Sequence, residues 1–259
     1  MLFIRYFIII FLLSYTQCVF AKEKIILAAD VWCPYNCEPD SKNPGFLIEM
    51  AQIIFEEHDI EIEYRLMPWS KALDAVKNGS IHAVVGASKA SDRNFIYPDH
   101  YQALDVINCY VREEVNWNYS GNASLSGKKL GLILNYKYPY EVSEYIDNLY
   151  LETPDKIFFA TGNNAVKQNV DSLRDGIIDV YLENANVMDS FISYFKIPDI
   201  KKAGSVNVNP TKVYIAFSPE IRKSYIYASM LSRGMVKIRN SGQLADLYKK
   251  YGIYTGLEK

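Results

Sequence analysis

The chain predicts an α/β fold divided into two lobes of similar plan. Segments with strand and helix periodicity alternate through residues 24–87, which is the pattern of a largely parallel sheet connected by helices. The same alternation begins again at residue 128. In both halves a helix ends at a glycine, Gly79 or Gly176, and a strand follows at once. We therefore expect two sheets, each with its own helices.

Each predicted element follows from local spacing. Residues 47–55 place apolar side chains three and four positions apart, as one face of a helix does, whereas residues 60–66 alternate strictly and predict a strand with one solvated face. The first half is expected to contain strands 24–30, 60–66 and 81–87 and helices 47–55 and 69–76. The second half is expected to contain strands 128–134, 157–159 and 177–182 and helices 140–151 and 166–173.

One lobe boundary is expected where the chain becomes polar. The other is expected where the chain returns from the second lobe to the first. Residues 113–126 are rich in Asn, Ser and Gly and mark the entry to the second lobe. After a strand at 212–217, helical segments between residues 226 and 248 are expected to cover the first lobe. The expected division is a first lobe of residues 22–112 and 218–259 and a second lobe of residues 113–217. Two chain crossovers would then form a hinge beside a cleft.

Residues 1–21 have the features of a secretory signal peptide. Arg5 supplies a positive charge, residues 7–13 form a short apolar run, and small residues precede a cut after Ala21. The run is shorter than the ~20 residues that a membrane-spanning helix needs. An uncleaved anchor, or lipidation at Cys18, is the alternative. We predict an exported, periplasmic protein.

Composition and charge limit the classes of partner. Removal of 21 residues from 259 leaves 238, and because Arg5 is the charged residue lost, the formal net charge changes from −2 to −3. A net charge this close to zero predicts neither a basic surface that binds nucleic acid nor a polybasic surface that binds membranes. With 49% hydrophobic residues, the chain can bury a proper core.

Three cysteines remain after the leader. In an exported protein Cys33 and Cys37 most simply form a disulfide across residues 34–36. A metal site is the competing interpretation, but no His-x-His motif or second cysteine pair accompanies it. Cys109 lies in the apolar segment 106–111 and is expected to be a buried free thiol. We predict no metal and no cofactor.

Several residues stand where an α/β sheet binds ligands, beyond the carboxyl ends of its strands. Asp30, Trp32 and Tyr35 follow the first predicted strand, and the predicted disulfide would hold their loop in shape. Trp69 begins the second predicted helix and would either stack on a planar ligand or pack in the core.

Five segments in order and spacing resemble a known family across essentially the whole exported chain. They are ADVWCPYNC, GFLIEMAQIIFEEHDIEIEYRLMPWSKALDAVKNGSIHAVVGASKASDR, LSGKKLGLILNY, LRDGIIDVYLEN and SGQLADLYKKYGI. Together they resemble the extracellular solute-binding proteins of the amino-acid-receptor type, which feed ABC transporters. The resemblance implies the two-lobed type II periplasmic-binding architecture with two crossovers. It also implies a small-molecule ligand, a membrane permease or sensor as partner, a monomer, no nucleic acid and no catalysis.

The resemblance implies roles for residues of the first lobe. Arg93 stands where the family clamps a ligand carboxylate, with Ser88 as a hydroxyl contact before it. This sequence departs from the family pattern, because Ala90 stands where the family usually has threonine. The alternative is a surface arginine paired with Asp92 or Asp99.

The second lobe departs from the family at two positions. Asn184 stands where amino-acid receptors place the aspartate that pairs with the ligand ammonium, and Glu183 is one residue earlier. Neighbouring strand residues face opposite ways, so Glu183 is not automatically a substitute. Tyr136 stands where the family has a small hydroxyl residue, and Asn135 and Tyr136 together suggest a cleft reshaped by a larger aromatic. We expect a polar ligand, anionic or amino-acid-like, but not necessarily an ordinary α-amino acid.

The sequence is also consistent with two other functions. A sensory module would pass the same ligand signal to a membrane signalling partner instead of a transporter. An enzyme similar to cyclohexadienyl dehydratases would need a positioned acid in the cleft, for which Glu183 or Asp30 could serve. No Ser-His-Asp or Cys-His arrangement accompanies them in the sequence.

Overall fold

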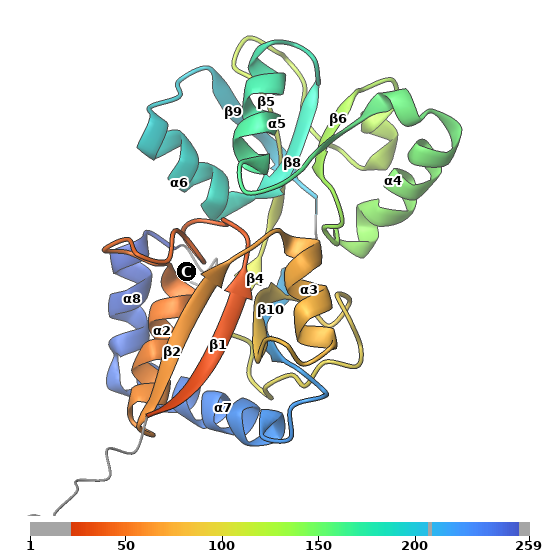
Figure 1. The fold of residues 1–259 in the computed structure, drawn as a ribbon. Helices are drawn as coiled ribbons and strands as arrows, with labels where there is room; N and C mark the ends of the chain where they lie inside the picture. The colour runs from red at the N-terminus through yellow and green to blue at the C-terminus, as the bar shows by residue number, and fades with distance from the viewer. Residues whose placement is uncertain (1–21, 207–208, 254–259) are drawn as a thin grey trace, which may run out of the picture.

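A computed structural model describes residues 22–206 and 209–253, and within them the chain forms two lobes, one above the other in Figure 1. Each lobe contains a 5-stranded sheet, ordered β2-β1-β3-β10-β4 in the first and β7-β6-β8-β5-β9 in the second. The strands of the first sheet are β1 (Glu23–Ala29), β2 (Ile60–Leu66), β3 (Ala83–Ala87), β4 (Ala103–Asp105) and β10 (Thr211–Phe217). Those of the second are β5 (Ile107–Arg112), β6 (Leu130–Ile133), β7 (Ile157–Ala160), β8 (Val180–Asn184) and β9 (Ile200–Ser205).

Helices flank both sheets. The first lobe contains α2 (Phe46–Glu56), α3 (Trp69–Lys77), α7 (Ser224–Ser241) and α8 (Gln243–Tyr251). The second contains α4 (Tyr140–Glu152), α5 (Ala165–Arg174) and α6 (Ala185–Phe195), with short 3-10 helices η1 (Asn122–Leu125) and η2 (Pro154–Lys156). The helices and parallel strands predicted from local spacing are confirmed.

The two sheets repeat one plan. β1 pairs in parallel with β2 and β3, and β6 pairs in parallel with β7 and β8. In each sheet an antiparallel strand then joins the third of these strands, β10 beside β3 and β5 beside β8. The strands β1 and β2 point their carboxyl ends toward the second lobe (Figure 1). Residues that follow these strands are therefore placed between the lobes.

The crossovers lie elsewhere than the sequence indicated. The chain leaves the first sheet after Asp105 and returns to it at Thr211, so residues 107–112 belong to the second sheet and residues 211–217 to the first. The expected boundaries at 113 and 218 assigned both strands to the opposite lobe. Both strands are almost entirely buried, and burial alone does not say which sheet a strand joins. The polar stretch 113–126 is a loop of the second lobe that leads into η1.

The C-terminal helices complete the first lobe. α7 packs on α2 and β10, and α8 packs on α2 and α7. Gly234 of α7 meets Ile54 of α2 so closely that a Cβ atom on the glycine would lie 2.3 Å from a methyl carbon of Ile54. The last third of the chain is thus bound to the first third.

The predicted signal peptide lies outside the described residues. None of the helices in the described part of the chain has the length and apolarity that crossing a membrane requires.

The contact between α7 and α2 predicts an effect of Gly234→Ala. Alanine favours a helix over glycine by about 1 kcal/mol, but overpacking against Ile54 costs typically 1–3 kcal/mol, so we expect the substitution to lower the free energy of unfolding. Urea unfolding of the two proteins measures the difference. Arg233→Ala, at the exposed neighbouring position, is the control and should change stability by less than about 0.5 kcal/mol. Equal stabilities of Gly234→Ala and the wild type would contradict the close packing.

Candidate functional site

A cavity lies at the junction of the two lobes and has a volume of about 60 Å³. Its walls come mainly from segments that follow the strands of the first sheet, and the second lobe closes one side. The lining residues are Asp30, Trp32, Asn36, Trp69, Val85, Gly86, Ser88, Ser91, Asp105, Thr211 and Val213 from the first lobe, with Tyr136 and Lys137 from the second.

The loop after β1 forms one wall and is held rigidly. A disulfide joins Cys33 to Cys37, as predicted, and the Trp32 amide donates to the Asn36 carbonyl at 2.8 Å. The Asn36 side chain donates in turn to the Asp30 carbonyl at 2.7 Å. Beneath the loop, the ring of Tyr35 stacks on Trp32 with a centroid separation of 4.3 Å. These contacts fix the positions of Trp32 and Asn36 at the cavity.

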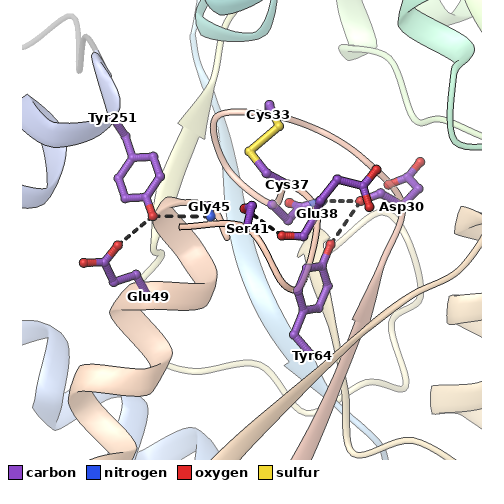
Figure 2. Close-up of a disulfide and its surroundings, with 10 residues drawn as sticks. Asp30, Cys33, Cys37, Glu38, Ser41, Gly45, Glu49, Tyr64 and Tyr251 are labelled. Carbon is purple, nitrogen blue, oxygen red and sulfur yellow. Dashed lines mark hydrogen bonds between the residues drawn. A yellow bond between two sulfur atoms is a disulfide. The ribbon is translucent and has the colours of Figure 1, made fainter. Parts of the chain in front are cut away.

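The C-terminal helix secures the far end of the same loop. The Tyr251 hydroxyl accepts a hydrogen bond from the Gly45 amide at 3.3 Å and donates one to the Glu49 carboxylate at 2.6 Å (Figure 2). Gly45 has a φ of 116°, and a Cβ atom there would lie 2.5 Å from the carbonyl oxygen of Tyr35. Only glycine fits where the loop turns into α2.

Asp30 connects the two lobes. It directly follows β1, its side chain is almost completely buried, and it accepts a hydrogen bond from the Tyr136 hydroxyl of the second lobe at 2.8 Å. Burial raises the pKa of Asp30 to about 6, although the bond from Tyr136 favours the charged form and partly offsets this. The ring of Tyr136 also meets that of Trp69 edge to face, with centroids 6.1 Å apart.

Glu183 makes a second contact between the lobes. This buried carboxylate of β8 accepts hydrogen bonds from the Tyr181 hydroxyl at 2.5 Å and from the Asn184 amide at 2.8 Å. The Trp32 indole of the first lobe donates to it at 3.4 Å. Burial is the main cause that raises the pKa of Glu183 to about 7.

Asn184 is occupied by structural bonds. It caps α6, where its side-chain oxygen accepts from the Val187 amide at 3.0 Å, and its side-chain nitrogen donates to the Asp105 carboxylate at 2.7 Å. Asp105 ends β4 at the first crossover, and burial raises its pKa to about 6. An asparagine here stabilises the start of a helix and links it to the hinge.

Most of the residues predicted from the sequence lie at or beside the cavity. Asp30, Trp32, Trp69, Ser88 and Tyr136 line it. Three others lie behind these residues: Glu183 and Asn184, as described, and Tyr35. The Tyr35 hydroxyl accepts from Asn186 at 2.7 Å and donates to the carbonyl of Leu104 at 3.2 Å.

The structure does not bring Arg93 and Asn135 to the cavity. Arg93 is exposed and lines a separate surface cavity of about 480 Å³ beside α7. The cause is a turn at residues 88–92, where the Tyr97 hydroxyl is bonded to the carbonyls of Ser88 and Asp92, each at 2.8 Å. This turn leaves Ser88 and Ser91 at the cavity and carries the next residues away from it. Asn135 is exposed with a left-handed φ of 66° and shapes the turn before Tyr136.

Four polar lining residues were not identified from the sequence. Asp105 was missed because the hinge was placed after residue 112. Asn36 and Ser91 stand on the loops that follow β1 and β3, and their predicted neighbours on the same loops were the available signal. Lys137 follows Tyr136 on the second lobe.

Comparisons with known proteins agree with this architecture. Residues 25–253 match the family model described as bacterial extracellular solute-binding proteins, family 3. The Bacillus subtilis (strain 168) protein named "Probable amino-acid-binding protein YxeM" is 20% identical over 223 residues, which cover 84% of this chain and 79% of that protein.

Solved structures share the fold at low identity. A structure from work on glutathione import via GshT and the cystine ABC importer TcyBC of Streptococcus mutans matches with a TM-score of 0.74 and 14% identity, covering 89% of this chain and 95% of that one. A histidine kinase sensor domain with similarity to periplasmic binding proteins matches with a TM-score of 0.72 and 17% identity, covering 89% and 96%. The predicted two-lobed type II periplasmic-binding architecture is confirmed.

The buried carboxyl of Asp30 predicts how stability depends on pH. Its pKa of about 6 in the folded protein exceeds its ordinary value of 3.8, so between these values the folded state binds more protons than the unfolded state. Its contribution to the free energy of unfolding is therefore present at low pH and is lost as pH rises from about 4 to about 6. Asp30→Asn cannot titrate and should lose roughly 1–3 kcal/mol less than the wild type between pH 4 and pH 7.

Urea unfolding at several pH values measures this difference. Asp74→Asn, at an exposed position on α3, is the control and should follow the wild-type profile. Parallel profiles for Asp30→Asn and the wild type would show that Asp30 has an ordinary pKa.

Proposed function

The chain belongs to the bacterial extracellular solute-binding proteins of family 3, and from this premise we propose that it captures a small polar solute between its lobes and delivers it to an ABC-type transporter. The observation that supports this best is the cavity at the lobe junction, to which both lobes contribute polar and aromatic side chains. A solute held there would touch both lobes at once. It would therefore stabilise the closed arrangement by the contacts that exist only in that arrangement.

Five of the sequence-predicted residues form the proposed binding surface. Asp30, Trp32, Trp69 and Ser88 would meet the solute on the first lobe, and Tyr136 would cover it from the second. Asp30 and Tyr136 already share a hydrogen bond, so lobe closure and solute contact use the same side chains. We further propose that Tyr35, Glu183 and Asn184 position the lining residues. Tyr35 stacks on Trp32, Glu183 accepts from the Trp32 indole, and Asn184 donates to Asp105.

Export is part of the proposal. The family is extracellular, and a signal peptide cleaved after Ala21 would release a monomeric protein into the periplasm. The cleavage point itself lies outside the described residues.

A sensory role is the second candidate. The similarity to a histidine kinase sensor domain, at a TM-score of 0.72, shows that this fold also occurs in a signalling protein. Lobe closure would then be detected by a membrane signalling partner. Crosslinking the solute-loaded protein to membranes of its own cells distinguishes the two roles. Capture of a transporter permease would support solute delivery, and capture of a signalling receptor would support the sensory role. The dehydratase-like enzyme would instead turn over prephenate or arogenate, and the matched family consists of binding proteins.

The proposal predicts that a solute both stabilises and compacts the protein. A thermal-shift screen of the exported chain against amino acids, small organic acids and amines should yield a compound that raises the melting temperature in line with its concentration over its Kd. Small-angle scattering should show a smaller radius of gyration in its presence. Stabilisation without compaction would place the solute outside the junction of the lobes.

Trp69→Ala should weaken binding of that compound at least tenfold, because it removes an aromatic wall of the cavity. Tyr194→Ala removes a ring that is 79% exposed on α6 and should leave the Kd unchanged. Calorimetry measures both values. Equal losses in the two variants would contradict the proposed surface.

A further inference from the structure

The charge of the cavity is negative. Asp30 and Asp105 line it, and the carboxylate of Glu183 lies directly behind Trp32. In the part of the chain that the structure describes, neither Asp30 nor Glu183 forms an ion pair with a lysine, arginine or histidine. Their partners are instead neutral donors: a tyrosine for Asp30, and a tyrosine, an indole and a backbone amide for Glu183. Buried carboxylates bonded only to neutral groups favour a cation nearby.

Asn36 supplies a second, independent observation. Its side chain is 1% exposed, and its oxygen has no hydrogen-bond partner within the described chain. The amide nitrogen of the same side chain is already bonded to the Asp30 carbonyl, so the free oxygen is fixed as an acceptor at the cavity. A buried acceptor without a donor is available to an N–H group of a bound molecule.

Gly86 leaves free space beside the buried Asn36 oxygen. Gly86 lines the same cavity, and a Cβ atom on it would lie 3.8 Å from the Asn36 oxygen and 3.7 Å from the ring of Trp32. Its φ of 96° favours glycine, so no side chain fills this space. Asn36 and Asp30, which are bonded to each other, therefore both contribute acceptors to one wall of the cavity.

Aromatic rings surround these acceptors. Trp32, Trp69 and Tyr136 line the cavity, and the faces of such rings attract cations. Arg93, the expected carboxylate clamp, lies at a different surface cavity. The one basic lining residue of the described chain, Lys137, is exposed and belongs to the second lobe.

From these contacts we propose that the solute carries a cationic amine or guanidine whose N–H groups bond to Asp30 and to the side-chain oxygen of Asn36. This inference deepens the proposed function and rests on it. An anionic solute would bring like charge against Asp30 and Asp105, and it would offer no donor to Asn36. The wall thus selects for positive charge by attraction and against negative charge by repulsion.

Compounds of matched length and different charge test the proposal. The cationic set is cadaverine, lysine, agmatine and arginine, and the anionic set is glutarate and adipate, which carry no amine. At 10 mM or below, we expect at least one cationic compound to raise the melting temperature of the exported chain and to give a measurable Kd by calorimetry. We expect no shift with glutarate or adipate. Failure of all four cations, or an anion that binds as tightly as the best cation, would overturn the proposal.

Asp30→Asn tests whether the Asp30 carboxylate causes the preference for cationic solutes. The substitution keeps the shape of the side chain and an oxygen that can accept from Tyr136, so the fold should be retained. The Kd of the best cation should rise at least tenfold, while Asp74→Asn on the exposed face of α3 should leave it unchanged. An unchanged Kd in Asp30→Asn would overturn the role of this carboxylate, and if this variant does not fold, the charge series on the wild type decides alone.

Scattering separates failure of this inference from failure of the proposed function. Compaction of the lobes by glutarate or adipate would leave the proposed function intact and overturn the cationic ligand. Absence of both compaction and thermal shift with every compound of the two sets would overturn the inference, and the wider screen for the proposed function would then decide whether any solute is bound.

Discussion

A buried carboxylate at the end of β1 organises the junction of the two lobes. Asp30 is surrounded by the first lobe, yet its hydrogen-bond donor, the Tyr136 hydroxyl, comes from the second lobe. A buried charge needs such a partner, since an isolated one would carry a large desolvation cost. The lobes are thus joined by polar groups at the very place where the cavity opens. A solute bonded to Asp30 would act on the same hydrogen bond that joins the lobes.

The surrounding fold serves to place this carboxylate and its neighbours. Parallel strands bring the ends of β1 and β3 to one edge, and the disulfide of Cys33 and Cys37 holds the loop that carries Trp32 and Asn36. The C-terminal helix α8 contributes the Tyr251 hydroxyl that secures the start of α2. Residues separated by some 200 positions therefore cooperate in keeping one short loop in shape.

Much of the fold was predictable because its signals are local. The spacing in helices, the alternation in β2 and the glycines at 79 and 176 all act within a few residues. The sheet membership of residues 107–112 and 211–217 was not predictable, since both are buried strands whose partners are distant in the chain. Asp30 and Trp32 were expected at the cavity because they follow a strand, and Tyr136 because of its position in the family resemblance. Arg93 was misplaced because its position depends on a turn pinned by Tyr97.

The most direct measurement is a crystal structure of the exported protein with the tightest-binding compound of the charge series bound. The account predicts electron density at the lobe junction, with a ligand nitrogen within about 3 Å of both the Asp30 carboxylate and the Asn36 side-chain oxygen, and with Tyr136 covering it. A ligand carboxylate against this wall, or a compound bound beside Arg93 and α7, would contradict it.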